Sequence, residues 1–252
     1  MDWKVACDEG LTRVVASGTV FTSSDIDYTV KVEAGGLQPF TQYWYQFSVC
    51  GSDNSSPLGR TKTAPNPDDD VTSVKVAVYS CSNYPFGFFN AYGNPARKDS
   101  IDYAIHLGDY IYEYANGDYG WGDSIGRISL PNREIYTLYD YRKRLATYRT
   151  DLDLLASHQQ FAWITVWDDH ELADNTYRDG SSGLNNTEAS FIEESGGISV
   201  DQRKMNAVRA YFEWMPLRQV EMDDNLRIWR SFSIGKLFDL VMLDTRGYDR
   251  SM

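Results

Sequence analysis

Three short stretches of the sequence carry side chains that bind metal ions or transfer protons in proteins. They are YSCSN at 79–83, HLGDYIYEY at 106–114 and VWDDHE at 166–171. The candidate groups are the thiol, phenol, imidazole and carboxylates of Cys81, Tyr112, His170, Asp109, Asp168 and Asp169. A thiolate and a phenolate favour a trivalent ion such as iron(III), whereas carboxylates favour calcium, magnesium or manganese. If the three stretches meet, the sequence predicts a metal site with mixed ligands.

Each stretch follows an apolar run that is typical of a buried strand. These runs lie at 74–80, 103–108 and 162–167, and a fourth lies at 237–244. Helical patterns at 133–160 and 200–216 alternate with them. Strands that alternate with helices predict an α/β domain with a parallel sheet, whose functional residues gather at the carboxyl ends of the strands.

The region before this domain reads as short β segments, at 14–21, 27–33 and 42–50. The sequence GLQPFTQYWYQF resembles the tyrosine corner of fibronectin-type modules, where a tyrosine early in a strand bonds back to the preceding loop. Such a module needs roughly 100 residues, so we expect its first strands to be missing. The predicted organisation is a partial β-sandwich over 1–63, a linker over 64–73 that is rich in proline and aspartate, and the α/β domain over 74–252.

Composition and charge restrict the partners of this chain. It has 252 residues, 42% of them hydrophobic, and 24 basic against 36 acidic side chains give a net charge of −12. This charge disfavours nucleic acid, and an anionic substrate would need a local cation such as a metal ion. We expect no transmembrane segment, because no run of about 18 apolar residues exists. The chain starts without a signal peptide, yet glycosylation sequons at Asn54 and Asn185 predict a secreted or cell-surface protein.

Taken in order, the motifs resemble one known family. The stretches SCSNYPFGFFNAY, HLGDYIYEY, YRKRLATYRTDLDLLASHQQFAWITVWDDHELADN and MLDTRGYD are similar to those of the PhoD-like alkaline phosphatases, a branch of the calcineurin-like metallophosphoesterases. The resemblance implies a layered α/β sandwich, here its N-terminal part, after a small fibronectin-type-like β-sandwich. It also implies hydrolysis of phosphate mono- or diesters by a metal-activated water, with iron(III) plus calcium or another divalent ion as cofactors.

The resemblance also implies roles for individual residues. Asp109 would bridge two metal ions, and Cys81 and Tyr112 would bind the iron. Asp169 would bind the second metal, Asp168 is a further candidate ligand, and His170 would lie beside the phosphoryl group. Asp244 and Arg246 would support the site.

Plainer interpretations stand beside these roles. Cys81 could be an ordinary buried cysteine, Asp109 the start of a turn, Tyr112 a core aromatic and His170 a surface imidazolium. Of the three cysteines, Cys7 and Cys50 both lie in the β region, and a disulfide between them is the favoured pairing. We expect Arg142, Arg144 and Arg149 to form a solvated face of the helical segment. We also expect His106 and His158 to have structural roles.

One part of the family pattern is missing from this chain. Later segments of the family supply histidine motifs such as Gly-Asp-x-His, and the only histidines here are His106, His158 and His170. We therefore expect a chain that is truncated at both ends. The alternative function is a non-catalytic fragment or binding module that keeps the family fold without turnover.

Overall fold

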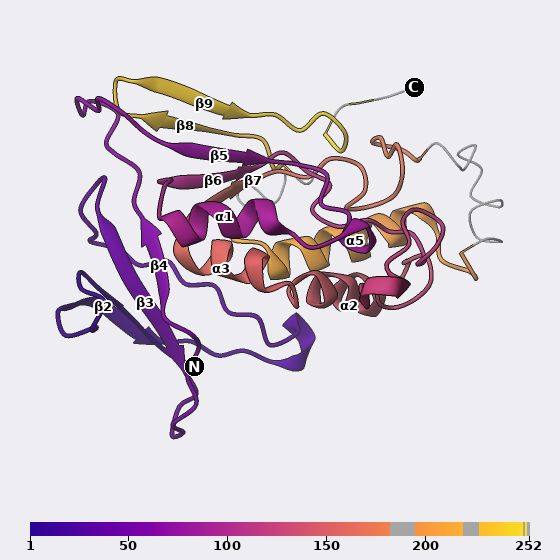
Figure 1. The fold of residues 1–252 in the computed structure, drawn as a ribbon, viewed down its shortest axis with the longest axis horizontal. Coiled ribbons are helices and arrows are strands. Elements are labelled where there is room, and N and C mark those ends of the chain that lie inside the picture. The colour runs from indigo at the N-terminus through magenta and orange to yellow at the C-terminus, as the bar shows by residue number, and fades with distance from the viewer. Residues whose placement is uncertain (182–194, 219–226, 249, 251–252) are drawn as a thin grey trace.

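The computed structural model describes residues 1–181, 195–218, 227–248 and 250, and it divides into an N-terminal antiparallel sheet and an α/β part (Figure 1). The first sheet has the order β2-β1-β3-β4, and its neighbouring strands are antiparallel. Its strands are β1 (Asp2–Ala6), β2 (Val14–Thr19), β3 (Gln42–Ser48) and β4 (Gly59–Lys62).

The tyrosine corner predicted for this region is confirmed. Tyr43 is buried near the start of β3, and its hydroxyl accepts a hydrogen bond from the main-chain N–H of Gln38 at 2.8 Å. The predicted strand at 27–33 is wrong, because Asp27 and Tyr28 adopt φ angles of 53° and 54°, which no β ladder accommodates. Residues 1–63 therefore form one sheet, and the predicted sandwich is not observed.

The α/β part contains a parallel sheet of order β5-β6-β7. Its strands β5 (Val76–Tyr79), β6 (Tyr103–His106) and β7 (Ala162–Thr165) lie inside the three predicted apolar runs. The register aligns Tyr79, His106 and Thr165, so the three carboxyl ends lie at one level. The predicted strand at 237–244 also exists, as β9 (Phe238–Met242), but it pairs antiparallel with β8 (Arg230–Ile234) and is mostly exposed.

Four helices lie on one side of these strands (Figure 1). They are α1 (Asn90–Lys98), α2 (Leu138–Tyr148), α3 (Leu152–Gln160) and α5 (Val200–Trp214). Val76 and Val78 of β5 and Val241 of β9 are exposed apolar side chains. In the described part of the chain, helices therefore cover one side of the parallel sheet, and the layered sandwich stays a prediction.

The single helix predicted over 133–160 is two helices. The first ends at Tyr148, and Asp151 starts the second, because its carboxylate accepts the main-chain N–H groups of Asp153 and Leu154 at 3.0 and 3.1 Å. The solvated arginine face is also wrong. Arg144 is fully buried, and its guanidinium donates to main-chain carbonyls of the 130–133 loop, including that of Pro131 at 3.0 Å.

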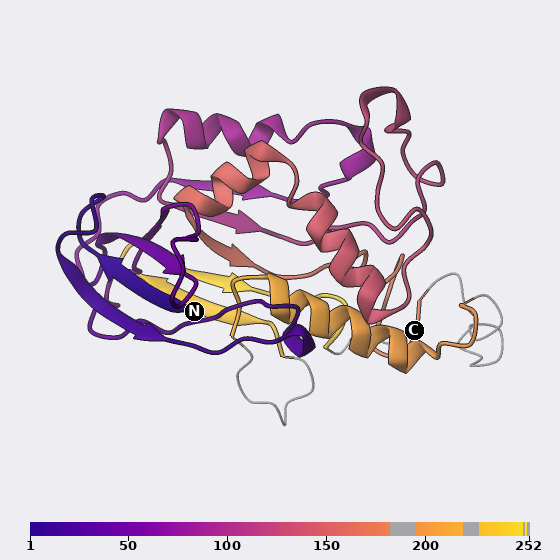
Figure 2. The ribbon, with the colours of Figure 1, turned by 90° about the horizontal axis from the view of Figure 1, so that it is seen from below.

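The N-terminal sheet is attached to one end of the α/β part (Figure 2). Lys62 pairs with Asp102 at 2.6 Å, and the Tyr103 hydroxyl donates to the carbonyl of Thr63 at 2.9 Å. Since Tyr103 starts β6, this junction lies at the amino ends of the parallel strands. The edge that carries the candidate site is therefore on the opposite side of the sheet.

The predicted Cys7–Cys50 disulfide is wrong for this fold. All three cysteines are free. The β1–β3 register pairs Asp2 with Ser48 and Ala6 with Trp44, which places Cys7 and Cys50 at opposite ends of the ladder. At about 3.3 Å per residue they lie roughly 20 Å apart, whereas a disulfide needs Cα atoms within about 7 Å.

Two observations bear on cellular location. Asn54, the first sequon, is exposed in the segment after β3, whereas Asn185 lies outside the described residues. Within the described ranges, none of the helices has the length and apolar character that crossing a bilayer requires.

Candidate metal centre

The three motif stretches meet at the carboxyl edge of the parallel sheet. Past the ladder, the N–H of Cys81 donates to the carbonyl of Gly108 at 3.1 Å, and the N–H of Ser82 donates to that of Asp109 at 2.8 Å. Cys81 and Asp109 themselves adopt φ angles of 58° and 55°. This left-handed conformation is uncommon outside glycine and is found at functional sites, where surrounding structure must hold it.

Asp109 is at the centre of the arrangement. Its Oδ2 lies 3.3 Å from the sulfur of Cys81 and accepts the hydroxyl of Tyr112 at 3.2 Å. Its Oδ1 is buried and has no hydrogen-bond partner among the described residues. Ligand atoms of Asp109, Asp169 and His170 all lie within 4.8 Å of one another. A buried carboxylate oxygen without a partner is costly, so this donor set fits a metal ion.

The thiol and the phenol are protonated groups in this environment. Burial raises the pKa of Cys81, and Asp109 adds to the effect. Burial followed by the negative charge of Asp109 also raises the pKa of Tyr112 well above its ordinary range. Either group would therefore have to release a proton to become a metal ligand.

His170 is held by the carboxylate of Glu113, for which the motifs predicted no role. Its Nδ1 lies 2.8 Å from Oε2 of Glu113, and the ring of Tyr112 stacks on the imidazole at 4.3 Å between centroids. Burial lowers the pKa of His170, but the hydrogen bond and charge of Glu113 outweigh it and raise the pKa to about 9. Because Nδ1 is engaged by Glu113, Nε2 is the nitrogen left to face a metal ion or a phosphoryl group.

Asp168 pairs with a cationic side chain and is not part of the group formed by Asp109, Asp169 and His170. Its two carboxylate oxygens accept from Arg246 at 2.6 and 3.2 Å. The same guanidinium lies 3.4 Å from Asp169, and Asp244 accepts the indole N–H of Trp167 at 2.9 Å. Asp244 and Arg246 thus lie beside the candidate ligands, and their supporting role and metal binding by Asp168 stay predictions.

Glu113 and Glu171 make contacts that the motif pattern did not predict. Both are almost fully buried, and both lie inside the motif stretches that drew attention. Their proximity in sequence to Tyr112 and His170 was the only available signal. Burial raises the pKa of Glu171 to about 8, although main-chain N–H donors act in the opposite direction.

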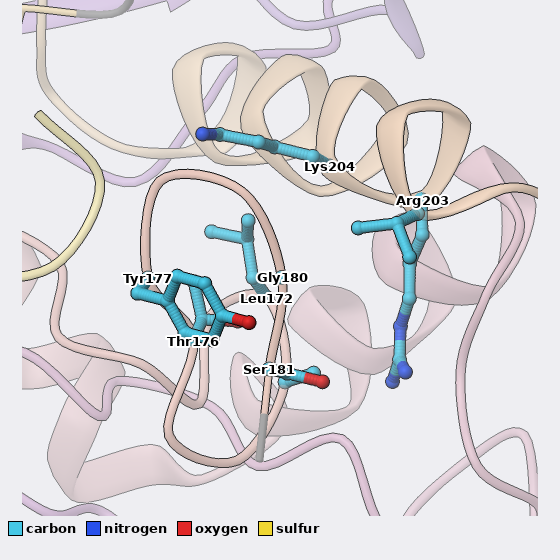
Figure 3. Close-up of a pocket in the computed structure, with 9 residues that line it drawn as sticks. Leu172, Thr176, Tyr177, Gly180, Ser181, Arg203 and Lys204 are labelled. Carbon is cyan, nitrogen blue, oxygen red and sulfur yellow. The ribbon is translucent and has the colours of Figure 1, made fainter. Parts of the chain in front are cut away.

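A pocket lies between residues 172–181 and α5 (Figure 3). Its lining includes Leu172, Tyr177, Arg203 and Lys204. Arg203 pairs with Glu134 at 2.8 Å. None of the candidate ligands lines this pocket, so the candidate metal site lies at the sheet edge and not in the pocket.

The fold and the site define an α/β protein with a candidate metal centre at the carboxyl edge of a parallel sheet. Comparison with known sequences is more specific: the chain belongs to the PhoD-like phosphatase family. The model of that family matches residues 76–252, and the model of its N-terminal domain matches residues 1–65.

Two relatives support the assignment. The chain is 38% identical over 252 residues to alkaline phosphatase D of Bacillus subtilis (strain 168), a match that covers 98% of this chain and 40% of the relative. The solved structure of PhoD superposes with a TM-score of 0.85 at 36% identity and covers 98% of this chain and 45% of that one. The chain therefore spans less than half the length of the relatives it matches.

Proposed function

We propose that this protein is a phosphoric ester hydrolase of the alkaline phosphatase D type, acting on phosphate mono- or diesters. The observation that carries the proposal is the convergence of Cys81, Tyr112, Asp169 and His170 around Asp109, whose Oδ1 is buried without a partner. Membership of the PhoD-like phosphatase family supports it.

In this proposal, Cys81, Asp109 and Tyr112 would hold iron(III), and Asp109 and Asp169 would hold calcium or another divalent ion. When bound, the ions supply Lewis acidity and an activated water near neutral pH. The acidic charge of the protein as a whole does not prevent phosphate binding, because bound ions dominate the local field.

The side chains of the chain would contribute in three ways. Glu113 orients the imidazole of His170 and keeps it protonated, so that Nε2 can donate a proton to the leaving alkoxide. Arg246 compensates the charges of Asp168 and Asp169 next to the reacting phosphate. Tyr112 packs its ring against His170 and limits the motion of the imidazole.

The test is the metal content and ester hydrolysis of the purified protein, with Cys81→Ala and Cys50→Ala compared. Cys50 is exposed in the N-terminal region and serves as the matched control. We expect the Cys81 variant to lose iron and most of its activity, and the Cys50 variant to keep both. A Cys81→Ala protein with full iron content would refute the ligand assignment. A folded wild-type protein that binds metal and hydrolyses neither monoesters nor diesters would favour the non-catalytic alternative.

We also propose that the protein acts outside the cell. The exposed position of Asn54 supports modification at this sequon. Mass spectrometry of the protein from its natural host tests this: an unmodified Asn54 peptide and recovery from the cytoplasm would contradict the proposal.

A further inference from the structure

The candidate ligands lie beyond the end of the β ladder, so main-chain pairing within the sheet does not hold them. The segments after β5 and β6 keep two main-chain bonds past the ladder, made by Cys81 and Ser82. Between the segments after β6 and β7, the last main-chain bond in the described part of the chain is from Val166 N–H to the carbonyl of His106. Asp109 and Asp169 both lie past that point. Main-chain hydrogen bonds between the strands therefore do not set their mutual position.

We propose that Glu171 and Tyr148 are positioning residues, which hold the ligand-bearing segments together by accepting hydrogen bonds from their main-chain N–H groups. The inference rests on the proposed function for its consequence, which is metal affinity. The structural part of the proposal does not depend on that function, because each side chain connects two segments that are distant in sequence.

Glu171 connects the segments after β6 and β7. Its Oε1 accepts the N–H of Tyr110 at 2.5 Å, and its Oε2 accepts the N–H of Asp168 at 2.9 Å. One carboxylate thus holds the residue after Asp109 and the residue before Asp169. Its side chain is 1% exposed, and both oxygens are directed at main-chain donors. Glu171 therefore acts on the site through its neighbours and not as a ligand.

Gly108 shows how closely these two segments approach. A Cβ at this position would lie 2.2 Å from the main-chain nitrogen of Asp168, so the segments meet without space for a side chain. Gly108 also has a φ of 114°, which other residues rarely adopt. The close contact and the bridge by Glu171 together determine the separation of Asp109 and Asp169.

Tyr148 connects the segments after β5 and β6 in the same manner. Its hydroxyl oxygen accepts the N–H of Tyr84 at 3.2 Å and the N–H of Tyr112 at 3.1 Å. Tyr148 lies in α2 and is fully buried. Its phenol therefore sets the distance between Tyr112 and the segment that contains Cys81. The side chains of Cys81 and Tyr112 both contact Asp109.

Metal sites need their donors held to about 0.5 Å, and removal of the groups that orient ligands typically weakens metal affinity about 10- to 100-fold. Loss of either positioning residue should therefore reduce metal affinity although no ligand is removed. A residue that only contributed to folding would lower stability without a selective effect at the site.

The first variant is Tyr148→Phe, which removes the hydroxyl and keeps the packing of the ring. Tyr43→Phe is the matched control, because Tyr43 makes the same kind of bond to Gln38 in the N-terminal sheet. In Tyr148→Phe we expect amide hydrogen exchange at Tyr84 and Tyr112 to accelerate about tenfold, as for loss of one net hydrogen bond. Binding of Fe³⁺ and Ca²⁺, measured separately by equilibrium dialysis, should weaken about tenfold or more. Tyr43→Phe should change neither.

The second variant is Glu171→Gln, which keeps the shape of the side chain and loses one of the two acceptors. We expect faster exchange at the amide of Tyr110 or Asp168 and a 10- to 100-fold loss of metal affinity. Unchanged exchange at these amides, or wild-type metal affinity in both folded variants, would overturn the proposal. If the wild-type protein bound neither ion, the proposed function would fail, and amide exchange would still decide whether these side chains hold the segments.

Discussion

One fully buried and one partly buried histidine predict how this protein responds to acid. His106 is fully buried, where its Nδ1 accepts the N–H of Gly108 at 3.2 Å and its Nε2 lies 3.0 Å from the hydroxyl of Tyr92. Burial lowers the pKa of His106 to about 3. Burial, with the nearby charge of Arg149, also lowers the pKa of His158 well below its usual value. Both side chains are therefore neutral in the folded protein.

The sign of the effect follows from proton uptake. An unfolded histidine has a pKa of about 6.5, so below that pH the unfolded chain binds protons that the folded core excludes. The free energy of unfolding then falls as the pH falls, by about 1.4 kcal/mol per pH unit for each histidine. At about pH 5 each histidine would cost about 2 kcal/mol.

Glu171 acts in the opposite direction over the same range. Its pKa of about 8 in the folded protein exceeds the ordinary value of a glutamate, so the folded state holds the extra proton. Its contribution increases stability as the pH falls from about 8 towards 4.5. As the pH falls, the two histidines lower the free energy of unfolding and Glu171 raises it, so the net loss for these three groups is about 1.4 kcal/mol per pH unit. A comparison between variants separates the effect of the histidines from that of Glu171.

The assay is urea unfolding of the metal-free protein at about pH 7.5, 6 and 5, with wild type and His158→Gln compared. Glutamine keeps an acceptor for the hydroxyl of Tyr110, which lies 2.8 Å from the imidazole. We expect the variant to lose less stability on acidification, with a slope shallower by about 1.4 kcal/mol per pH unit. The slopes are compared between about pH 6 and 5, where His170→Gln is the control, because a histidine with a raised pKa is protonated in both states in that range. Equal slopes in wild type and His158→Gln would refute the reasoning.

Three further predictions concern other parts of the fold. Arg127→Ala should destabilise the protein by about 3–5 kcal/mol in urea unfolding, since it leaves Asp151 buried without its partner at 2.8 Å; a loss below about 1 kcal/mol would contradict this. Gly108→Ala should lower both the thermal midpoint and the metal content, because its Cβ meets the main chain at 2.2 Å, and normal metal content in this variant would argue against the close approach described above. The denatured, unreduced protein should react with a thiol reagent at all three cysteines, whereas one reactive thiol would reveal a disulfide.

Much of the α/β part could be predicted from local pattern. The strands β5, β6 and β7 and the helix α5 lie within the predicted segments, because buried parallel strands are continuous apolar runs and an amphipathic helix has its own period. The tyrosine corner was likewise readable, since Tyr43 and Gln38 are only five residues apart.

Other elements were decided by contacts that local pattern does not contain. The alternating segment 27–33 satisfies a strand pattern, but the left-handed residues Asp27 and Tyr28 prevent it from joining a ladder. Arg144 is a charged residue of the kind that forms a solvated helix face, yet it is buried because main-chain carbonyls of the 130–133 loop accept its hydrogen bonds.

The order of residues along the chain shows which reactive groups follow which strands, and hence the family and the edge of the sheet where chemistry is expected. Which of these groups meet depends on the folded arrangement. It pairs His170 with Glu113 and Asp168 with Arg246, and it separates Cys7 from Cys50. The physical reason is that hydrogen bonds and ion pairs need side chains within a few ångströms. For residues far apart in the chain, strand register and packing set that distance, and neither is encoded in the spacing of a motif.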